Sequence, residues 1–189
     1  MPRIAIVLTQ GFADWECAYI AGTGGPFYGM DVRFFTPSPG EVTSQGGLRA
    51  LVEASTDGIA DWAPEVLAVA GGLGWDREGA PDISEALVAR HARGGTVAGI
   101  CGGTLALARA GLLDGVRHTS NDRGFLAENA PTYAGAERYE ASARAIEDGR
   151  IVTAPGTAPA SFAAAVFRHA GMDDETAARF LAMTAAEHG

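Results

Sequence analysis

The chain has 189 residues, 47% of them hydrophobic and 20% charged, and its formal net charge at pH 7 is -9. This length suits a single domain spanning 1–189, and the composition excludes an intrinsically disordered chain. The acidic balance argues against nucleic-acid or anionic-membrane partners, and no apolar run approaches the roughly 18 to 20 residues that would span a bilayer.

The first residues and the cysteines bear on the cellular compartment. Residues 1–8 carry one basic side chain and a short apolar run, which predicts a first strand rather than a signal peptide. Cys17 and Cys101 lie far apart, so we expect two free thiols and a cytoplasmic protein. No cluster of Cys and His has the spacing of a zinc site, and we expect neither a metal nor a cofactor.

Short runs rich in Val and Ile alternate with longer stretches of helical period. In chain order the pattern predicts a strand at 3–8, a helix at 14–27 capped by Asp14, a strand at 32–36, a hairpin at 41–53, a strand at 65–70 and a helix at 81–92. It continues with a strand at 96–100, a helix at 103–110, strands at 116–120 and 150–153, and helices at 158–170 and 174–186.

Strands that alternate with helices indicate an α/β fold: a doubly wound, mostly parallel, flavodoxin-like sheet sandwiched by helices. Active sites of such folds lie outside the carboxyl ends of the strands. The residues at those ends are 9–12, 70–75, 101 and 119–121. We therefore expect the candidate site residues to gather at this edge of the sheet.

Cys101 stands between Gly99 and Gly103, directly after a predicted strand and before a predicted helix. This Gly-x-Cys-x-Gly pattern is typical of a nucleophile elbow, in which the glycines let strand and helix approach closely. The free N–H groups of the following helix would favour the thiolate, so we expect the pKa of Cys101 to fall below about 8.5. The alternative is an inert cysteine that fills a crowded turn.

Four segments together carry a family resemblance. They are Gly11-Phe12-Ala13-Asp14-Trp15-Glu16, Ala70-Gly71-Gly72, the stretch 99–115 around Cys101, and Ile151-Val152-Thr153-Ala154-Pro155-Gly156-Thr157. In this combination the chain resembles the ThiJ/PfpI superfamily, which includes the human parkinsonism protein and shares the class I glutamine-amidotransferase-like fold. The resemblance covers nearly the whole chain, and it implies a homodimer.

The resemblance also implies roles for particular residues. Glu16 would be a protonated acid partner that donates a hydrogen bond to the Cys101 thiolate. The N–H groups of Gly72 and Gly102 would form an oxyanion hole. The alternatives are a glutamate that complements a helix dipole and a plain strand-to-loop turn.

The chain departs from the family pattern where some members carry a histidine. Gly102 stands where peptidase-like members have one, and Asn121 stands where other members have one, as a candidate polar pocket residue. His118 lies three residues earlier and would either approach Cys101 or be a structural side chain of a strand. Trp75 would either roof the pocket or pack, whereas Trp15 and Cys17 are expected to pack.

These residues predict a cysteine-dependent enzyme of the hydratase, hydrolase or glyoxalase type that acts on a small-molecule substrate. Superfamily members that hydrate isocyanides also lack the histidine, which makes them the nearest analogue by resemblance. One alternative is a non-enzymatic redox sensor or stress-response protein with an oxidisable Cys101. An intracellular peptidase or amidase is disfavoured, because no securely placed histidine base accompanies Cys101.

Overall fold

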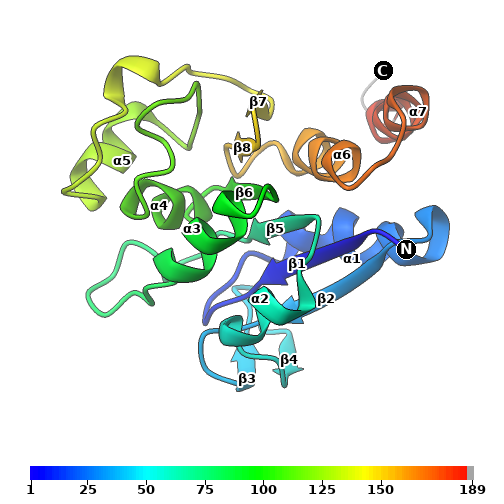
Figure 1. The fold of residues 1–189 in the computed structure, drawn as a ribbon, viewed down its shortest axis with the longest axis horizontal. Helices are drawn as coiled ribbons and strands as arrows, with labels where there is room; N and C mark the ends of the chain where they lie inside the picture. Colours follow the sequence, from blue (N-terminus) through cyan, green and yellow to red (C-terminus); the bar gives the residue numbers. More distant parts are fainter. Residues whose placement is uncertain (187–189) are drawn as a thin grey trace.

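The computed structural model describes residues 1–186, and a six-stranded sheet runs through the middle of them (Figure 1). Its order is β2-β1-β5-β6-β8-β7. The strands are β1 (Arg3–Val7), β2 (Asp31–Phe35), β5 (Val66–Val69), β6 (Thr96–Ile100), β7 (Ile146–Asp148) and β8 (Ile151–Ala154). All neighbouring strands are parallel except β7, which pairs antiparallel with β8. Without β7, the strands follow the flavodoxin-like order 2-1-3-4-5, as predicted.

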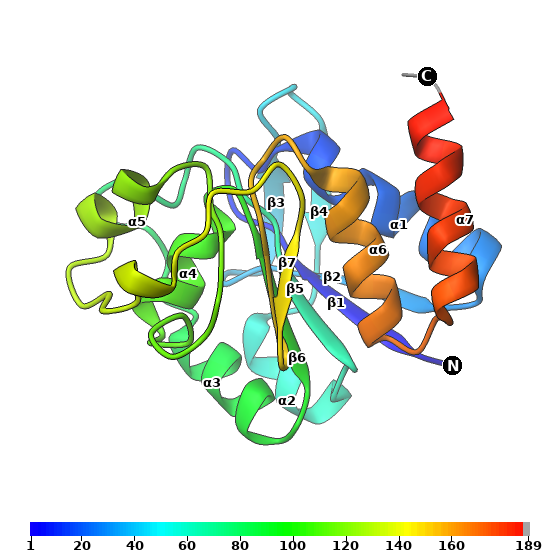
Figure 2. The same cartoon turned by 90° about the horizontal axis from the view of Figure 1, so that it is seen from above.

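Helices cover both faces of the sheet. Seen from above, α1 (Asp14–Tyr28), α6 (Pro159–His169) and α7 (Asp174–Ala185) lie on one side, and α2 (Ile59–Trp62), α3 (Ser84–Ala92), α4 (Gly103–Arg109) and α5 (Arg123–Asn129) on the other (Figure 2). Because side chains alternate along a strand, Ile4 and Ile6 of β1 pack in the first layer and Ala5 and Val7 in the second. Both layers are buried, so the central strands are apolar throughout.

The predicted hairpin is confirmed as β3 (Gly40–Thr43) and β4 (Arg49–Val52), which pair antiparallel. The prediction that Asp14 caps the first helix is wrong, because the N-cap is Ala13, without a side-chain hydrogen bond. The Asp14 carboxylate instead accepts hydrogen bonds from Ser44 Oγ at 2.5 Å and from the Gly46 N–H at 2.9 Å. The hairpin is therefore tied to the start of α1.

The predicted strand at 116–120 is also wrong. This segment forms only an isolated bridge between His118 and Tyr139, because β8 occupies the position beside β6 and β7 forms the sheet edge. The sequence pattern also missed α2, α5 and β7, and it began α3 three residues too early. Within the described part of the chain, no helix combines the length and the apolar character that crossing a membrane requires.

Candidate active site

Cys101 follows β6 directly and has a φ of 54°, in the left-handed region that side chains other than glycine rarely adopt. Its N–H donates to the Ala154 carbonyl at 2.9 Å, and its carbonyl accepts from Thr104 Oγ1 at 2.6 Å. The strained corner is thus fixed by hydrogen bonds on both sides. This is the backbone geometry of a nucleophile elbow.

The glycines around Cys101 are required by close packing. A Cβ at Gly103 would lie 2.4 Å from the Val69 carbonyl oxygen, and one at Gly99 would lie 2.9 Å from Leu107 Cδ1. Any side chain at these positions would push α4 away from the sheet. The elbow and the helix behind it therefore depend on the spacing read in the sequence.

Glu16 lies in the first turn of α1 and is 2% exposed. Its Oε2 accepts a hydrogen bond of 2.7 Å from the Gly71 N–H, whereas Oε1 is buried with no hydrogen-bond partner within residues 1–186. A Cβ at Gly156 would lie 3.0 Å from both Glu16 Oε1 and Cys101 Sγ. The carboxyl and the sulfur therefore border the same small space, and the helix-dipole alternative does not describe this buried side chain.

Burial raises the pKa of Glu16 to about 7. Burial, and then the negative charge of Glu16, raise the pKa of the Cys101 thiol to about 11, although hydrogen bonds from Asn121 and from the Gly102 N–H oppose the rise. The expected lowering of the Cys101 pKa is thus not found, because desolvation outweighs the N–H groups at the start of α4. Because the two groups interact, the proton that is lost first belongs to the pair and not to either residue alone.

Asn121 reaches the sulfur from the segment that follows the elbow helix. Its Nδ2 donates to Cys101 Sγ at 3.3 Å, and its Oδ1 accepts from the Gly156 N–H at 3.0 Å. The Thr119 N–H bonds to Thr153 Oγ1 at 2.9 Å, which holds the segment against β8. The structure therefore brings Asn121 together with Cys101 and Glu16.

Gly72 and Gly102 lie beside each other at the elbow. Gly72 has a φ of +136°, and a Cβ there would lie 2.2 Å from the Gly11 carbonyl oxygen, so only glycine fits. A Cβ at Gly102 would lie 3.4 Å from the Gly72 nitrogen. Neither N–H donates a hydrogen bond to an oxygen within the described residues. The Gly102 N–H faces the Cys101 sulfur, whereas the Gly72 N–H has no such contact.

His118 does not reach the site. It is fully buried, its Nδ1 lies 2.8 Å from the Val116 carbonyl oxygen, and its Nε2 lies 2.5 Å from the Tyr133 hydroxyl. Because both ring nitrogens are engaged, and because burial lowers its pKa, His118 is a structural side chain rather than a pocket residue. A structural role was one of the two alternatives that the sequence left open for His118.

Trp75 follows the packing alternative given for it, whereas the prediction that Trp15 packs is wrong. Trp75 is 0% exposed and donates its Nε1–H to the Ala70 carbonyl at 2.9 Å, so it packs under the elbow and does not roof a pocket. Trp15 is 47% exposed and donates to the Gly156 carbonyl at 2.9 Å, which places it at the rim of the site. Its position beside Glu16 was the one sequence signal for this role. Cys17 is buried as expected, and burial raises its pKa to about 11.

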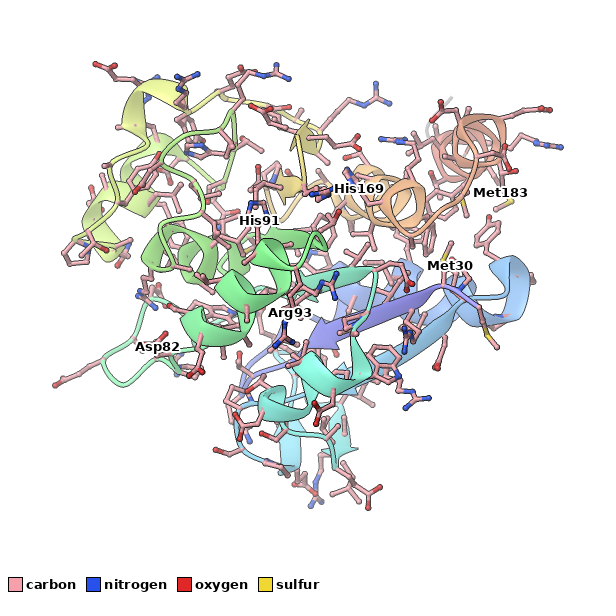
Figure 3. The ribbon with its side chains drawn as sticks, in the orientation of Figure 1. Met30, Asp82, His91, Arg93, His169 and Met183 are labelled. Carbon is pink, nitrogen blue, oxygen red and sulfur yellow. The ribbon has the colours of Figure 1, made fainter. Side chains whose placement is uncertain are left out.

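The other histidines lie on helices outside the site: His91 on α3 and His169 on α6 (Figure 3). The His169 ring bonds Thr96 Oγ1 at 2.9 Å and Glu147 at 3.2 Å. His188 lies outside the described residues. Among residues 1–186, no three or more His, Cys, Asp or Glu side chains are grouped so as to hold a metal ion.

Comparison with known proteins identifies the family and the fold. The chain is 29% identical over 173 residues to the Uncharacterized protease YoaZ of Bacillus subtilis, covering 88% of this chain and 82% of that protein. The DJ-1 superfamily protein Atu0886 from Agrobacterium tumefaciens is 37% identical, with a TM-score of 0.93 and full coverage of both chains. Drosophila melanogaster DJ-1beta, at 20% identity and a TM-score of 0.74 over 95% of each chain, shares the fold. The sequence profile of the DJ-1/PfpI family matches residues 2–169, and the chain belongs to that family.

Proposed function

We propose that this protein is a cysteine-dependent enzyme that acts on a small electrophile, with Cys101 as the nucleophile and Glu16 as its acid partner. One observation carries the proposal: the strained Cys101 corner shares a small space with a buried carboxyl whose Oε1 has no partner among residues 1–186. A carboxyl with a pKa of about 7 is suited to both giving and taking a proton near neutral pH.

The proposed reaction begins when the Cys101 thiolate forms a bond to the electrophilic carbon. Negative charge develops on the substrate heteroatom, where the Gly72 and Gly102 N–H groups stabilise it, and the Glu16 carboxyl gives that atom its proton. The Glu16 carboxylate then takes a proton from water while the hydroxide adds to the carbon, and the sulfur leaves as thiolate. The net result is hydration, with thiolate and protonated carboxyl restored.

A peptidase is a weaker proposal for this chain. A Cys–His peptidase uses a histidine base, and His118 is occupied by Val116 and Tyr133. Asn121, which contacts the sulfur instead, cannot accept the thiol proton at neutral pH. The site therefore supports chemistry in which the carboxyl is the proton carrier.

The test is the pH dependence of alkylation at Cys101, followed by mass spectrometry with buried Cys17 as the internal control. If the single negative charge of the pair resides on the sulfur, Cys101 becomes reactive as the pH rises through about 7. Glu16→Gln then moves the midpoint to higher pH, because the variant removes the protonated carboxyl that donates a hydrogen bond to the thiolate.

The opposite result would show that the charge resides on Glu16. Glu16→Gln would then lower the midpoint of Cys101 alkylation, because the variant removes a like charge from beside the thiol. In that case Glu16 is no acid partner, and the proposed function fails.

A second candidate, a peroxide sensor, is favoured by the same unpartnered oxygen. Two peroxide molecules, each reduced to water, would oxidise the thiolate through sulfenate to sulfinate. Protonated Glu16 Oε1 and Asn121 Nδ2 would then be donors to the sulfinate oxygens. A sensor shows stoichiometric oxidation without turnover of any small electrophile, whereas an enzyme shows saturable turnover that Cys101→Ser abolishes.

A further inference from the structure

A cavity of about 520 Å³ opens beside Asn121. It is lined by Ser120, Asn121, Asp122, Arg123, Tyr139 and the segment 141–143. Asn121 belongs to both places, because its Nδ2 contacts the Cys101 sulfur at 3.3 Å while its side chain lines the cavity. The cavity therefore adjoins the side chain that contacts the Cys101 sulfur.

Arg123 is the single cation among the residues that line the cavity. Its guanidinium lies over the Tyr139 ring, 5.7 Å from the centroid, and Nη2 reaches the Tyr139 carbonyl at 3.5 Å. It forms no ion pair with any residue in the described range 1–186. Most of its N–H donors are thus free for a ligand.

Asp122 is the one acidic side chain in the same wall. Its Oδ1 accepts a hydrogen bond of 2.9 Å from the Phe125 N–H and so caps α5. This carboxylate is directed to the backbone of its own helix and does not pair with Arg123. The remaining lining groups are neutral hydroxyl, amide, phenol and methyl groups.

We infer that Arg123 binds a carboxylate of the substrate, so that the small electrophile attacked by Cys101 is one that carries a carboxylate group. This inference rests on the proposed function and deepens it. A guanidinium binds a carboxylate through two parallel N–H groups, which also orients the molecule toward the sulfur. It offsets the negative charge of the Cys101–Glu16 pair, which otherwise repels an anion.

The test compares two alkylating reagents that differ in charge. Iodoacetate is an anion and iodoacetamide is neutral, and in both cases the Cys101 thiolate forms a C–S bond and iodide leaves. The measured quantity is the ratio of the iodoacetate rate to the iodoacetamide rate at Cys101, at one pH and low salt. A common change in thiolate content cancels in this ratio.

We expect Arg123→Gln to lower the ratio about fivefold, as one charge a few ångströms away affects an anion in a partly solvated site. Arg123→Lys should retain most of the ratio, because it keeps the charge and loses only the paired N–H groups. In the wild type, added salt should lower the ratio toward the Arg123→Gln value.

Arg93→Gln is the matched control. The variant removes the same charge as Arg123→Gln. Arg93, however, lies between α3 and α2, where its Nη1 donates to the Ala60 carbonyl at 3.4 Å (Figure 3). This place is near the amino end of β6, whereas Cys101 follows its carboxyl end. Its ratio should equal that of the wild type. A change in this control as large as in Arg123→Gln would show an effect of net charge alone and would overturn the inference.

The remaining outcomes separate the inference from the function on which it rests. If Cys101 reacts with both reagents and the ratio is unchanged in Arg123→Gln, Arg123 binds no carboxylate and the proposed function stands. If Cys101 of the folded wild type reacts with neither reagent, the thiol is no nucleophile, and both proposals fail.

Discussion

Asn121 connects two parts of the site with the two ends of one amide. Nδ2 donates to the Cys101 sulfur, and Oδ1 accepts from the Gly156 N–H. A hydrogen bond to a charged acceptor contributes about 1.5 to 3 kcal/mol. In the proposed mechanism this donor stabilises the Cys101 thiolate, a different task from that of a histidine base.

Asn121→Asp tests this role with almost no change in shape. The variant can keep the bond from Gly156, but it replaces the donor on the sulfur by an oxygen that carries negative charge. We expect alkylation of Cys101 by iodoacetamide at pH 7 to slow by at least about tenfold, because the thiol pKa rises. Asn129→Asp on α5, where the side chain bonds only the Phe125 carbonyl, is the control and should alkylate at the wild-type rate.

Local spacing indicated Cys101, which follows β6 directly. Glu16 and Asn121 were indicated by the family resemblance, and the strand expected before Asn121 is absent. The sequence left the place of Trp75 open and did not predict that of Trp15. The partner that holds Trp15 at the rim is the carbonyl of Gly156, 141 residues away, and no local pattern reports that contact. Trp75 binds a carbonyl only five residues away, yet its burial depends on the whole second core layer.

At the scale of elements, Thr104 joins the elbow to the segment 119–121. Its Oγ1 donates to the Cys101 carbonyl, so the Ser120 hydroxyl, at 2.7 Å, must donate to Thr104. Both hydroxyl-bearing residues are buried. This chain of hydrogen bonds keeps Asn121 in reach of the sulfur.

Thr104→Val keeps the shape of the side chain and removes both bonds. It leaves the buried Ser120 hydroxyl without its acceptor, so the free energy of unfolding should fall by about 1 to 3 kcal/mol in urea titrations. Thr184→Val on α7, which loses one bond to the Leu181 carbonyl at a partly exposed site, should change it by no more than about 0.5 kcal/mol. Equal losses in the two variants would contradict the special role of Thr104.

Hydrogen bonds to the Asp14 carboxylate also connect the hairpin β3–β4 to the start of α1. Hydrogen bonding by Ser44 is the largest cause of the lowered pKa of Asp14, whose carboxylate also accepts from Gly46. Asp14→Asn removes the negative charge and one of the two acceptors, so the contacts with Ser44 and Gly46 weaken. We expect amide hydrogen exchange at Gly46 and Leu48 to become about threefold to fivefold faster. Asp173→Asn, which exchanges one good N-cap of α7 for another, should leave exchange in the hairpin unchanged.

The spacing of hydrophobic residues and the positions of glycines predicted the central strands and most helices, because burial stabilises those elements. They failed at 116–120, where the pattern resembles a strand but β8 takes the place beside β6. The segment is ordered instead by side chains: His118 with Tyr133, and Ser120 with Thr104. The short elements α5 and β7 have too few residues to show a period.

At the scale of the whole molecule, Glu147 connects the edge strand β7 to helix α6. From β7 it pairs with Arg168 and His169 of α6, and His169 in turn bonds Thr96 of β6. The hydrogen bond with His169, followed by the contacts with Arg168, lowers the pKa of Glu147 below its ordinary value of 4.5. Three elements from different parts of the chain are thus linked through Glu147 and His169.

A carboxylate with a lowered pKa in the folded state stabilises the fold above its unfolded pKa, and that stabilisation is lost as the pH falls through the folded pKa. Glu147→Gln should therefore have a lower urea midpoint than the wild type above about pH 5, and the difference should shrink as the pH falls below about 4. Glu175→Gln, which breaks an exposed pair with Arg179 on α7, should match the wild type throughout. A Glu147→Gln difference that persists at pH 3 would show that the effect is not ionic.

The lack of a side chain at Gly156 bears on how such a site can change in evolution. The Gly156 carbonyl accepts a hydrogen bond from Trp15, and its N–H donates one to Asn121. A Cβ at Gly156 would lie in the space that Cys101 and Glu16 share. A change from a glycine codon to an alanine codon needs one nucleotide, and the added methyl group would lie 3.0 Å from Cys101 Sγ and from Glu16 Oε1. A single mutation outside the two proposed reacting residues would therefore abolish the proposed chemistry.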